Sequence, residues 1–190
     1  MENKPLHLAS ASPRRQEILT ALGLNFSAGG ADVDERRLGD EPPGDMVLRL
    51  ARDKALAGAP ETGGVVLAAD TAVVLGNDVF GKPRDEADAL DMLAQLSACT
   101  HEVLTGVAVW DGREMRSVLS ATEVRFREID PDEARAYWQS GEPGDKAGAY
   151  AIQGKGGVFV EEINGSYSGV VGLPVFETVK LLQQAGIRVL

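Results

Sequence analysis

The chain has 190 residues, of which 44% are hydrophobic and 25% are charged, a composition typical of a folded protein of about one domain. Its 29 acidic residues outnumber the 19 Lys and Arg residues, and the net charge of -10 argues against a general nucleic-acid binder, because duplex binding requires a basic face. The single cysteine, Cys99, excludes an internal disulfide, and the two histidines are too few to build a zinc site.

The first residues, MENKPLHLAS, lack the basic segment and long apolar stretch of a secretory signal. No apolar run in the sequence approaches the roughly 18 to 20 residues needed to cross a bilayer. The scarcity of cysteine fits a reducing compartment. We therefore expect a cytoplasmic protein that binds neither a membrane nor nucleic acid.

The first half of the chain mixes strand and helix patterns. Leu6 to Ala9 is a short apolar run that predicts a buried strand. Ser12 and Pro13 then provide an N-cap and a first helical residue, and the apolar spacing behind them predicts a helix that stops at Gly23. The next predicted elements are a strand at Asn25 to Ala28, a polar loop at Gly29 to Gly44, and a helix from Met46 to Ala59, before Pro60.

The second half alternates strands and helices in the same way. Val65 to Ala69 and Ala72 to Leu75 predict two buried strands separated by Asp70 and Thr71. The later predicted elements are a turn at 76–78, a helix at Glu86 to Ser97, a long hairpin of Val103 to Trp110 and Met115 to Phe126, a helix from Asp130 to about Trp138, a glycine-rich irregular segment at Ser140 to Gly157, a strand at Val158 to Ile163 and a helix at Leu173 to Ala185. Because no linker is visible, we expect one α/β domain over residues 1–190.

The segment between the first strand and the first helix carries two hydroxyls and two arginines, Ser10, Ser12, Arg14 and Arg15. A helix N-terminus presents free N–H groups and a partial positive charge, and arginine forks suit phosphate oxygens. The segment therefore predicts an anion-binding site, although an ordinary capped helix with two solvated arginines also fits the pattern.

Asp70 interrupts an otherwise continuous apolar run from Val65 to Leu75. A carboxylate in such a place needs hydrogen bonds, a cation or a metal, and it is either a site residue or a group bonded to the backbone in a bend. Asp34 and Glu35 in the polar loop are either solvated or hold a magnesium or manganese ion together with Asp70, because these ions prefer oxygen ligands. Lys54 lies on the second helix, where a surface lysine is the alternative.

Two further segments combine polar side chains with glycines that allow close approach. Gly81-Lys82-Pro83 would hold Lys82 on a rigid turn, and Gln153 in DKAGAYAIQG offers a donor and an acceptor for a base edge. A solvated lysine and a surface glutamine are the alternatives. The sequence contains neither a Walker A phosphate loop nor a GxSxG elbow, which argues against P-loop NTPases and serine hydrolases, and we expect His101 to be structural.

Eight segments together resemble one protein family, in the same order and over nearly the whole chain, from about Leu6 to Leu182. They are LASASPRR, DER at Asp34 to Arg36, RLARDKA, AADT, GKPRD, HEVLTGV, DKAGAYAIQG and INGSYSGVVGLP. The chain is similar to the Maf family of nucleoside triphosphate pyrophosphatases, also called septum formation inhibitor proteins. The resemblance implies an α/β fold with a central mixed, largely antiparallel sheet flanked by helices, and two lobes around a deep nucleotide cleft, as in ITPase-like proteins.

The resemblance also implies a reaction. A nucleoside triphosphate would be hydrolysed between its α- and β-phosphates to a monophosphate and pyrophosphate, with a divalent cation, magnesium or manganese. The catalytic residues that the family pattern implies are Arg15, Glu35, Lys54, Asp70 and Lys82. Glu35 and Asp70 would hold the metal, and Asp70 would accept a proton, either directly or through the metal.

The branch of the family is indicated by residues that would contact the nucleotide. Arg14 in SPRR, Thr71 in ADT and Gln153 in AIQG resemble the branch that acts on dTTP and UTP rather than the branch that acts on 7-methyl-GTP, and Ser10 would also bind the nucleotide. The implied function is dTTP and UTP hydrolysis, with links to the removal of modified pyrimidine nucleotides and to arrest of septum formation. The alternative is a nucleotide-sensing regulator of cell division that does not hydrolyse its ligand. The family also implies a homodimer.

Overall fold

The computed structural model describes residues 4–59 and 63–190, so residues 1–3 and Pro60, which enter the predictions above, lie outside it. The described residues form two compact units. Unit 1 contains the described residues up to Asp70 together with residues 105–120 and 172–190, and unit 2 contains residues 71–104 and 121–171. The single domain and the cleft stay predictions. Among the helices of the described residues, none has the length and apolar character that crossing a bilayer requires.

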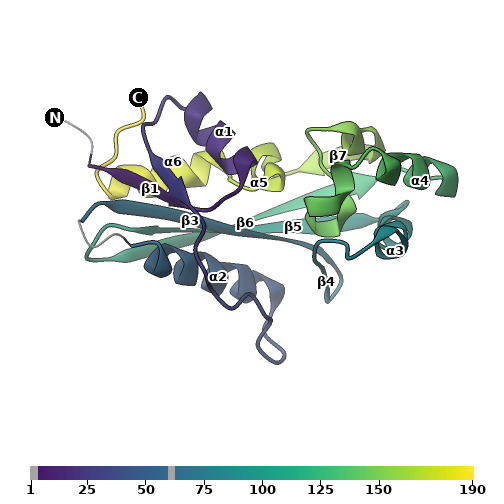
Figure 1. The fold of residues 1–190 in the computed structure, drawn as a ribbon, viewed down its shortest axis with the longest axis horizontal. Coiled ribbons are helices and arrows are strands. Elements are labelled where there is room, and N and C mark those ends of the chain that lie inside the picture. Colours follow the sequence, from purple (N-terminus) through teal and green to yellow (C-terminus); the bar gives the residue numbers. More distant parts are fainter. Residues whose placement is uncertain (1–3, 60–62) are drawn as a thin grey trace. The chain divides into compact units, whose positions relative to one another are not determined.

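The strands of the described residues form one mixed seven-stranded sheet (Figure 1). They are β1 (Leu6–Ala9), β2 (Ser27–Gly29), β3 (Val65–Leu75), β4 (Asp78–Phe80), β5 (Thr100–Trp110), β6 (Met115–Phe126) and β7 (Val160–Asn164). The strand order is β2-β1-β3-β5-β6-β7, and β4 pairs with β3. β1 pairs in parallel with β2 and β3, whereas β3–β4 and β6–β7 are antiparallel. The predicted α/β fold with a mixed sheet is confirmed.

In unit 1, helices cover both faces of the sheet. Figure 1 shows α1 (Pro13–Ala21) and α6 (Val175–Gln184) on one face and α2 (Pro43–Ala57) on the other. Side chains of a strand alternate between its faces, and in β3 Ala69 packs with Leu19 of α1, whereas Ala68 packs with Ala55 of α2. Asp70 lies two residues after Ala68, so it faces α2.

Small residues let α2 lie close to the sheet. The helix presents Ala51 and Ala55 to the strands. Gly106 of β5 contacts the helix backbone, since a Cβ at this position would overlap the carbonyl of Val47. This close approach brings the buried face of α2, which includes Lys54, against β3.

Unit 2 has its own core, to which α3 (Glu86–Leu96) and α4 (Pro131–Gln139) contribute. Phe126 packs edge-on against Tyr150, with 4.7 Å between ring centroids, and His101 packs edge-on against both rings. Helix α4 begins with a capping box, in which Asp130 and Glu133 exchange side chain–backbone hydrogen bonds.

Between α4 and β7 the chain makes short 3-10 turns at Glu142–Asp145, Ala147–Ala149 and Lys155–Phe159. The first two turns lie within the glycine-rich segment that is predicted to be irregular. The third extends to Phe159, so the last strand begins at Val160 and not at the predicted Val158.

Several elements differ from the predictions, among them β4, which was not predicted as a strand. β3 runs without interruption through Asp70 and Thr71, because a strand accommodates a carboxylate where a cation pairs with it. Helix α2 begins at Pro43, inside the predicted loop, since proline is favoured in the first helical turn. The short helix α5 (Tyr167–Val171) was not predicted, and the Ser166 hydroxyl supports its start by accepting the N–H of Gly169.

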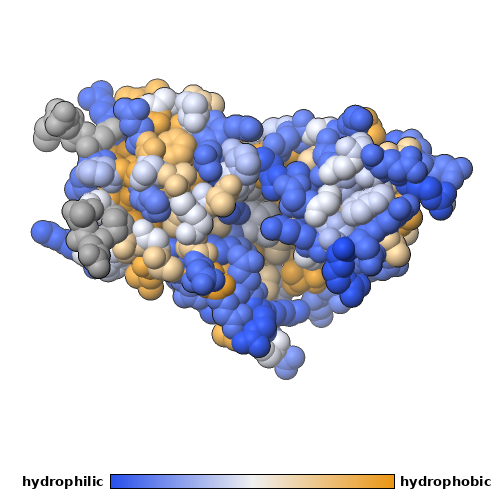
Figure 2. Space-filling model, in the orientation of Figure 1, coloured by the Kyte–Doolittle hydropathy of each residue, from blue (hydrophilic) through white to orange (hydrophobic). Residues whose placement is uncertain are grey.

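Figure 2 shows mostly hydrophilic residues over α4 of unit 2, whereas apolar residues gather over the β1 and α6 region of unit 1. On α6, Phe176 is 76% exposed, although Leu181 and Leu182 of the same helix are buried. Helix α6 therefore anchors in the core of unit 1 through one face and presents an aromatic ring to solvent.

Candidate functional site

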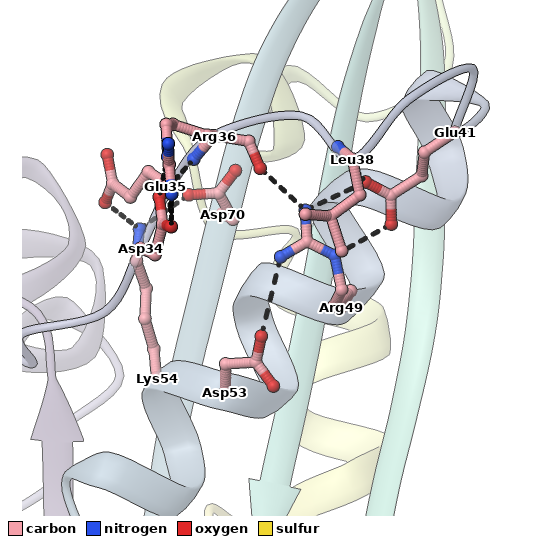
Figure 3. A network of polar contacts seen from close by, with 9 residues as sticks. All are labelled: Asp34, Glu35, Arg36, Leu38, Glu41, Arg49, Asp53, Lys54 and Asp70. Carbon is pink, nitrogen blue, oxygen red and sulfur yellow. Dashed lines mark hydrogen bonds and ion pairs between the residues drawn. The ribbon is translucent and has the colours of Figure 1, made fainter.

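Lys54 of α2 joins two carboxylates in unit 1 (Figure 3). Its Nζ lies 2.6 Å from Oδ1 of Asp70 and 2.6 Å from Oε1 of Glu35. The side chains of Lys54 and Asp70 are 11% and 14% exposed, whereas that of Glu35 is 64% exposed. The mutual pairing offsets the cost of removing the two buried charges from water. The structure thus brings together three of the predicted catalytic residues.

The local structure explains how Lys54 and Asp70 meet. Lys54 occupies the buried stripe of α2, at helical spacing from Val47 and Leu50. Asp70 faces the same helix because of the alternation along β3. The surface alternative for Lys54 is therefore wrong, and so is the bend alternative for Asp70, which lies inside a continuous strand and pairs with a side chain.

The loop that carries Glu35 is anchored to α2 by Arg49 (Figure 3). The Arg49 guanidinium donates to both carboxylate oxygens of Glu41 at 2.8 Å and to the carbonyl of Arg36 at 3.1 Å. Arg36 in turn donates to the carboxylate of Asp34, and these hydrogen bonds lower the pKa of Asp34 to about 2. Glu35 therefore lies between Asp34 and Arg36, which are hydrogen-bonded to each other, and Arg36 is also held by Arg49. The anchoring role of Arg49 and Glu41 was not predicted.

The turn after β1 brings Ser10 and Arg15 together. Nη1 of Arg15 donates to Oγ of Ser10 at 3.2 Å, and Nε donates to the carbonyl of Gly172 at 2.8 Å. Burial lowers the pKa of Arg15 and the carboxylate of Asp70 acts in the opposite direction, but an arginine stays charged at neutral pH. Ser12 is the N-cap residue as predicted, yet its side chain makes no capping hydrogen bond. The charged guanidinium beside a helix N-terminus fits an anion.

The other predicted site residues are placed as follows. Arg14 lies in the first turn of α1, and Thr71 follows Asp70 on β3; both are half-buried. Lys82 and Gln153 belong to unit 2 and are exposed, Lys82 between β4 and α3 and Gln153 in the irregular segment before β7. The solvated alternatives for Lys82 and Gln153 stay open, and the roles of all four residues stay predictions.

His101 is buried on β5, as its predicted structural role requires. Its Nε2 lies 2.9 Å from Oη of Tyr150, and within the described part of the chain its Nδ1 has no hydrogen-bond partner. Burial lowers the pKa of His101 to about 4, so the ring is neutral at pH 7.

Glu35 and Asp70 are the carboxylates that fit a divalent cation. Across residues 4–59 and 63–190, no three His, Cys, Asp or Glu side chains cluster into an all-protein metal site. Magnesium is commonly held by one or two carboxylates together with substrate phosphates. Oxygens of Glu35 and Asp70 already converge on one cation, the Lys54 ammonium. The pair therefore fits a divalent cation whose remaining ligands come from phosphate oxygens of a substrate.

Comparisons with known proteins find similar chains over nearly the whole length. A family model described as Maf-like protein matches residues 5–185. A protein of Anaeromyxobacter dehalogenans named dTTP/UTP pyrophosphatase is 57% identical over 186 residues, which cover 95% of this chain and 94% of the relative. A protein of Hahella chejuensis with the same name is 50% identical over 188 residues, 97% of this chain and 94% of the relative.

Among solved structures, a HAM1 protein from Coxiella burnetii superposes with a TM-score of 0.47 and 15% identity, covering 64% of this chain and 72% of that protein. The family model spans nearly the whole chain, and the two relatives match over nearly the full length of both partners. On these matches, the chain belongs to the Maf family.

Proposed function

We propose that this chain hydrolyses dTTP and UTP between the α- and β-phosphates and releases a monophosphate and pyrophosphate. The observation that carries the proposal is the near full-length similarity to relatives named dTTP/UTP pyrophosphatase. The cluster of Lys54, Glu35 and Asp70 supports it, because such a cluster supplies both a cation for phosphate and a carboxylate for water.

Arg15 and Lys54 would neutralise the phosphates. Both cations are fixed before a substrate binds, Arg15 by Ser10 and Gly172, and Lys54 by its two carboxylates. Fixed charges stabilise the negative charge that develops on the leaving pyrophosphate without a cost of reorganisation. We assign the same task to Lys82 of unit 2.

Asp70 would accept the proton of the attacking water. As that proton moves to the carboxylate, the oxygen bonds to phosphorus and the bridging oxygen leaves with the electron pair as part of pyrophosphate. Lys54, at 2.6 Å, holds the carboxylate in position. A magnesium or manganese ion on Glu35 and Asp70 would supply further charge neutralisation and activation of water.

Base selection is assigned to Gln153, with Arg14, Thr71 and Ser10 as further nucleotide contacts. An amide side chain both donates and accepts, which suits the mixed edge of a uracil or thymine base. We further propose a cytoplasmic location and a homodimer. Light scattering of the purified chain measures its molar mass in solution and so tests the homodimer.

The decisive assay measures release of pyrophosphate and monophosphate with magnesium, manganese or a chelator. The nucleotides are dTTP, UTP, CTP, GTP, ATP, 7-methyl-GTP and 5-methyl-UTP. We expect metal-dependent release that is strongest with dTTP or UTP. Asp70→Asn should abolish turnover and largely spare nucleotide binding, whereas the control Asp45→Asn, at an exposed position on the same helix as Lys54, should retain turnover.

The other outcomes are equally informative. Strongest turnover of 7-methyl-GTP would overturn the assignment of the base, and Asp70→Asn turnover near that of the parent would overturn the role of Asp70. Tight nucleotide binding without any turnover would favour the alternative, a nucleotide-sensing regulator of cell division.

A further inference from the structure

Tyr137 and Glu142 bind the backbone on both sides of Gln153. Tyr137 is the buried tyrosine of α4, and its hydroxyl donates to Oε1 of Glu142 at 2.7 Å. The same hydroxyl accepts the N–H of Ala151 at 3.0 Å. One side of the segment that carries Gln153 is thus tied to Tyr137, two residues before the glutamine.

Glu142 ties the other side. Its Oε2 accepts the N–H of Lys155 and its Oε1 accepts the N–H of Gly156, each at 3.0 Å. The carboxylate therefore holds three donors, counting the Tyr137 hydroxyl. The two side chains thus hold both ends of the segment 151–156, and Gln153 is exposed between these ends.

Glycines allow the backbone to lie directly on the two side chains. A Cβ at Gly154 would overlap the Glu142 carboxylate, and a Cβ at Gly156 would lie 2.5 Å from the Tyr137 hydroxyl. The neighbouring Ile152 is buried. The segment is therefore held by close packing as well as by hydrogen bonds.

The charge state of the pair suits this role. Burial and the hydrogen bond to Glu142 raise the pKa of Tyr137 further above its usual range, so its hydroxyl keeps its proton. Burial acts to raise the pKa of Glu142, but the hydrogen bonds from Tyr137 and from the backbone N–H groups outweigh it and lower that pKa. The donors and acceptors of the pair thus keep their roles at neutral pH.

We propose that Tyr137 and Glu142 form a clamp that positions Gln153 and thereby sets the discrimination between uracil or thymine and cytosine. The proposal rests on the function proposed above, in which Gln153 contacts the base. Thymine presents an acceptor, O4, where cytosine presents a donor, N4. A glutamine amide can offer its NH₂ to O4 or its oxygen to N4, so the discrimination depends on where the loop places the amide relative to the base. Both clamp residues are positioning residues that act through Gln153.

The first test compares the ratio of kcat/KM for dTTP to that for CTP in Glu142→Gln and Tyr137→Phe. The new amide places an NH₂ donor among backbone N–H donors, and the phenylalanine removes the acceptor of Ala151. We expect the ratio to fall about tenfold or more in each variant. The controls Glu162→Gln and Tyr167→Phe alter exposed residues of the same unit and should keep the ratio.

A double-variant cycle separates positioning from a general loss of structure. Once Gln153→Ala has removed the amide, adding Glu142→Gln should change the ratio little, whereas independent effects would add. Hydrogen exchange provides a readout that does not depend on turnover. The amides of Lys155 and Gly156 should exchange faster in Glu142→Gln than in the parent, and those of β7 should not.

The outcomes are distinct. An unchanged dTTP-to-CTP ratio in both clamp variants, additive effects in the cycle, or unchanged exchange at Lys155 and Gly156 would each overturn the clamp. A parent chain that releases no pyrophosphate from any nucleotide would instead overturn the proposed function, and amide exchange would still decide whether the two side chains fix the loop.

Discussion

The buried histidine of unit 2 predicts a defined pH dependence of stability. His101 has a pKa of about 4 in the folded chain, against 6.5 for an ordinary histidine, because burial disfavours its charged form. Between these two pH values the unfolded chain binds more protons than the folded chain. The contribution of His101 is therefore complete above pH 6.5 and is lost as the pH falls to 4. At 1.36 kcal/mol per pH unit it amounts to about 3 kcal/mol.

Urea unfolding at pH 7, 6, 5 and 4 measures this contribution. His101→Gln cannot gain a proton, so its free energy of unfolding should decline from pH 7 to pH 4 by about 3 kcal/mol less than that of the parent. Thr122→Ser, which changes another buried polar residue but one that does not titrate, is the control and should decline as the parent does. Equal declines in the parent and in His101→Gln would refute the argument, whatever their stabilities at pH 7.

Three further predictions concern other residues. Lys54→Met leaves two carboxylates without their shared cation, and pyrophosphate release from dTTP should fall by about 100-fold or more; turnover within a few-fold of the parent would contradict the assigned role. Gly106→Ala places a methyl group against the carbonyl of Val47, so it should lower the free energy of unfolding by about 1–3 kcal/mol and with it the urea midpoint. Gly81→Ala, at an open position, should leave the midpoint nearly unchanged. Hydrogen bonds from Arg116 hold the pKa of Asp111 at about 2, so stability should fall as the pH drops from 3.8 to 2, and Asp111→Asn should weaken that fall in acid unfolding.

The strands and helices of this chain are largely encoded by local patterns. Apolar runs predicted β1 and β3, and proline after a hydroxyl residue predicted the start of α1. The break that was wrongly predicted within β3 has a tertiary cause. Asp70 looked like a break in the strand because a lone carboxylate does not belong in a buried run, and its partner Lys54 lies on a different element.

Only part of the site could be predicted from the sequence, because some of its residues show a local pattern and others do not. Lys54 carries a signal in the sequence, since it falls on the apolar stripe of its helix, where an unpaired ammonium would be costly. Arg49 and Tyr137 carry no such signal. Each acts on backbone groups of a segment that comes close only after folding, so neither spacing nor periodicity distinguishes them from an ordinary helix arginine or core tyrosine.

The two loops that carry Glu35 and Gln153 are fixed by the same physical means. In each, a glutamate next to a helix accepts several hydrogen bonds and ties irregular backbone to that helix: Glu41 through Arg49 in unit 1, and Glu142 through Tyr137 in unit 2. Loops present functional side chains accurately only when a rigid element holds them. Gln153 is exposed, while Tyr137 and Glu142 hold the backbone on either side of it. A substitution confined to Gln153 should therefore change the base that is preferred and leave the stability of the chain nearly unaltered, whereas a substitution in the anchor should change both.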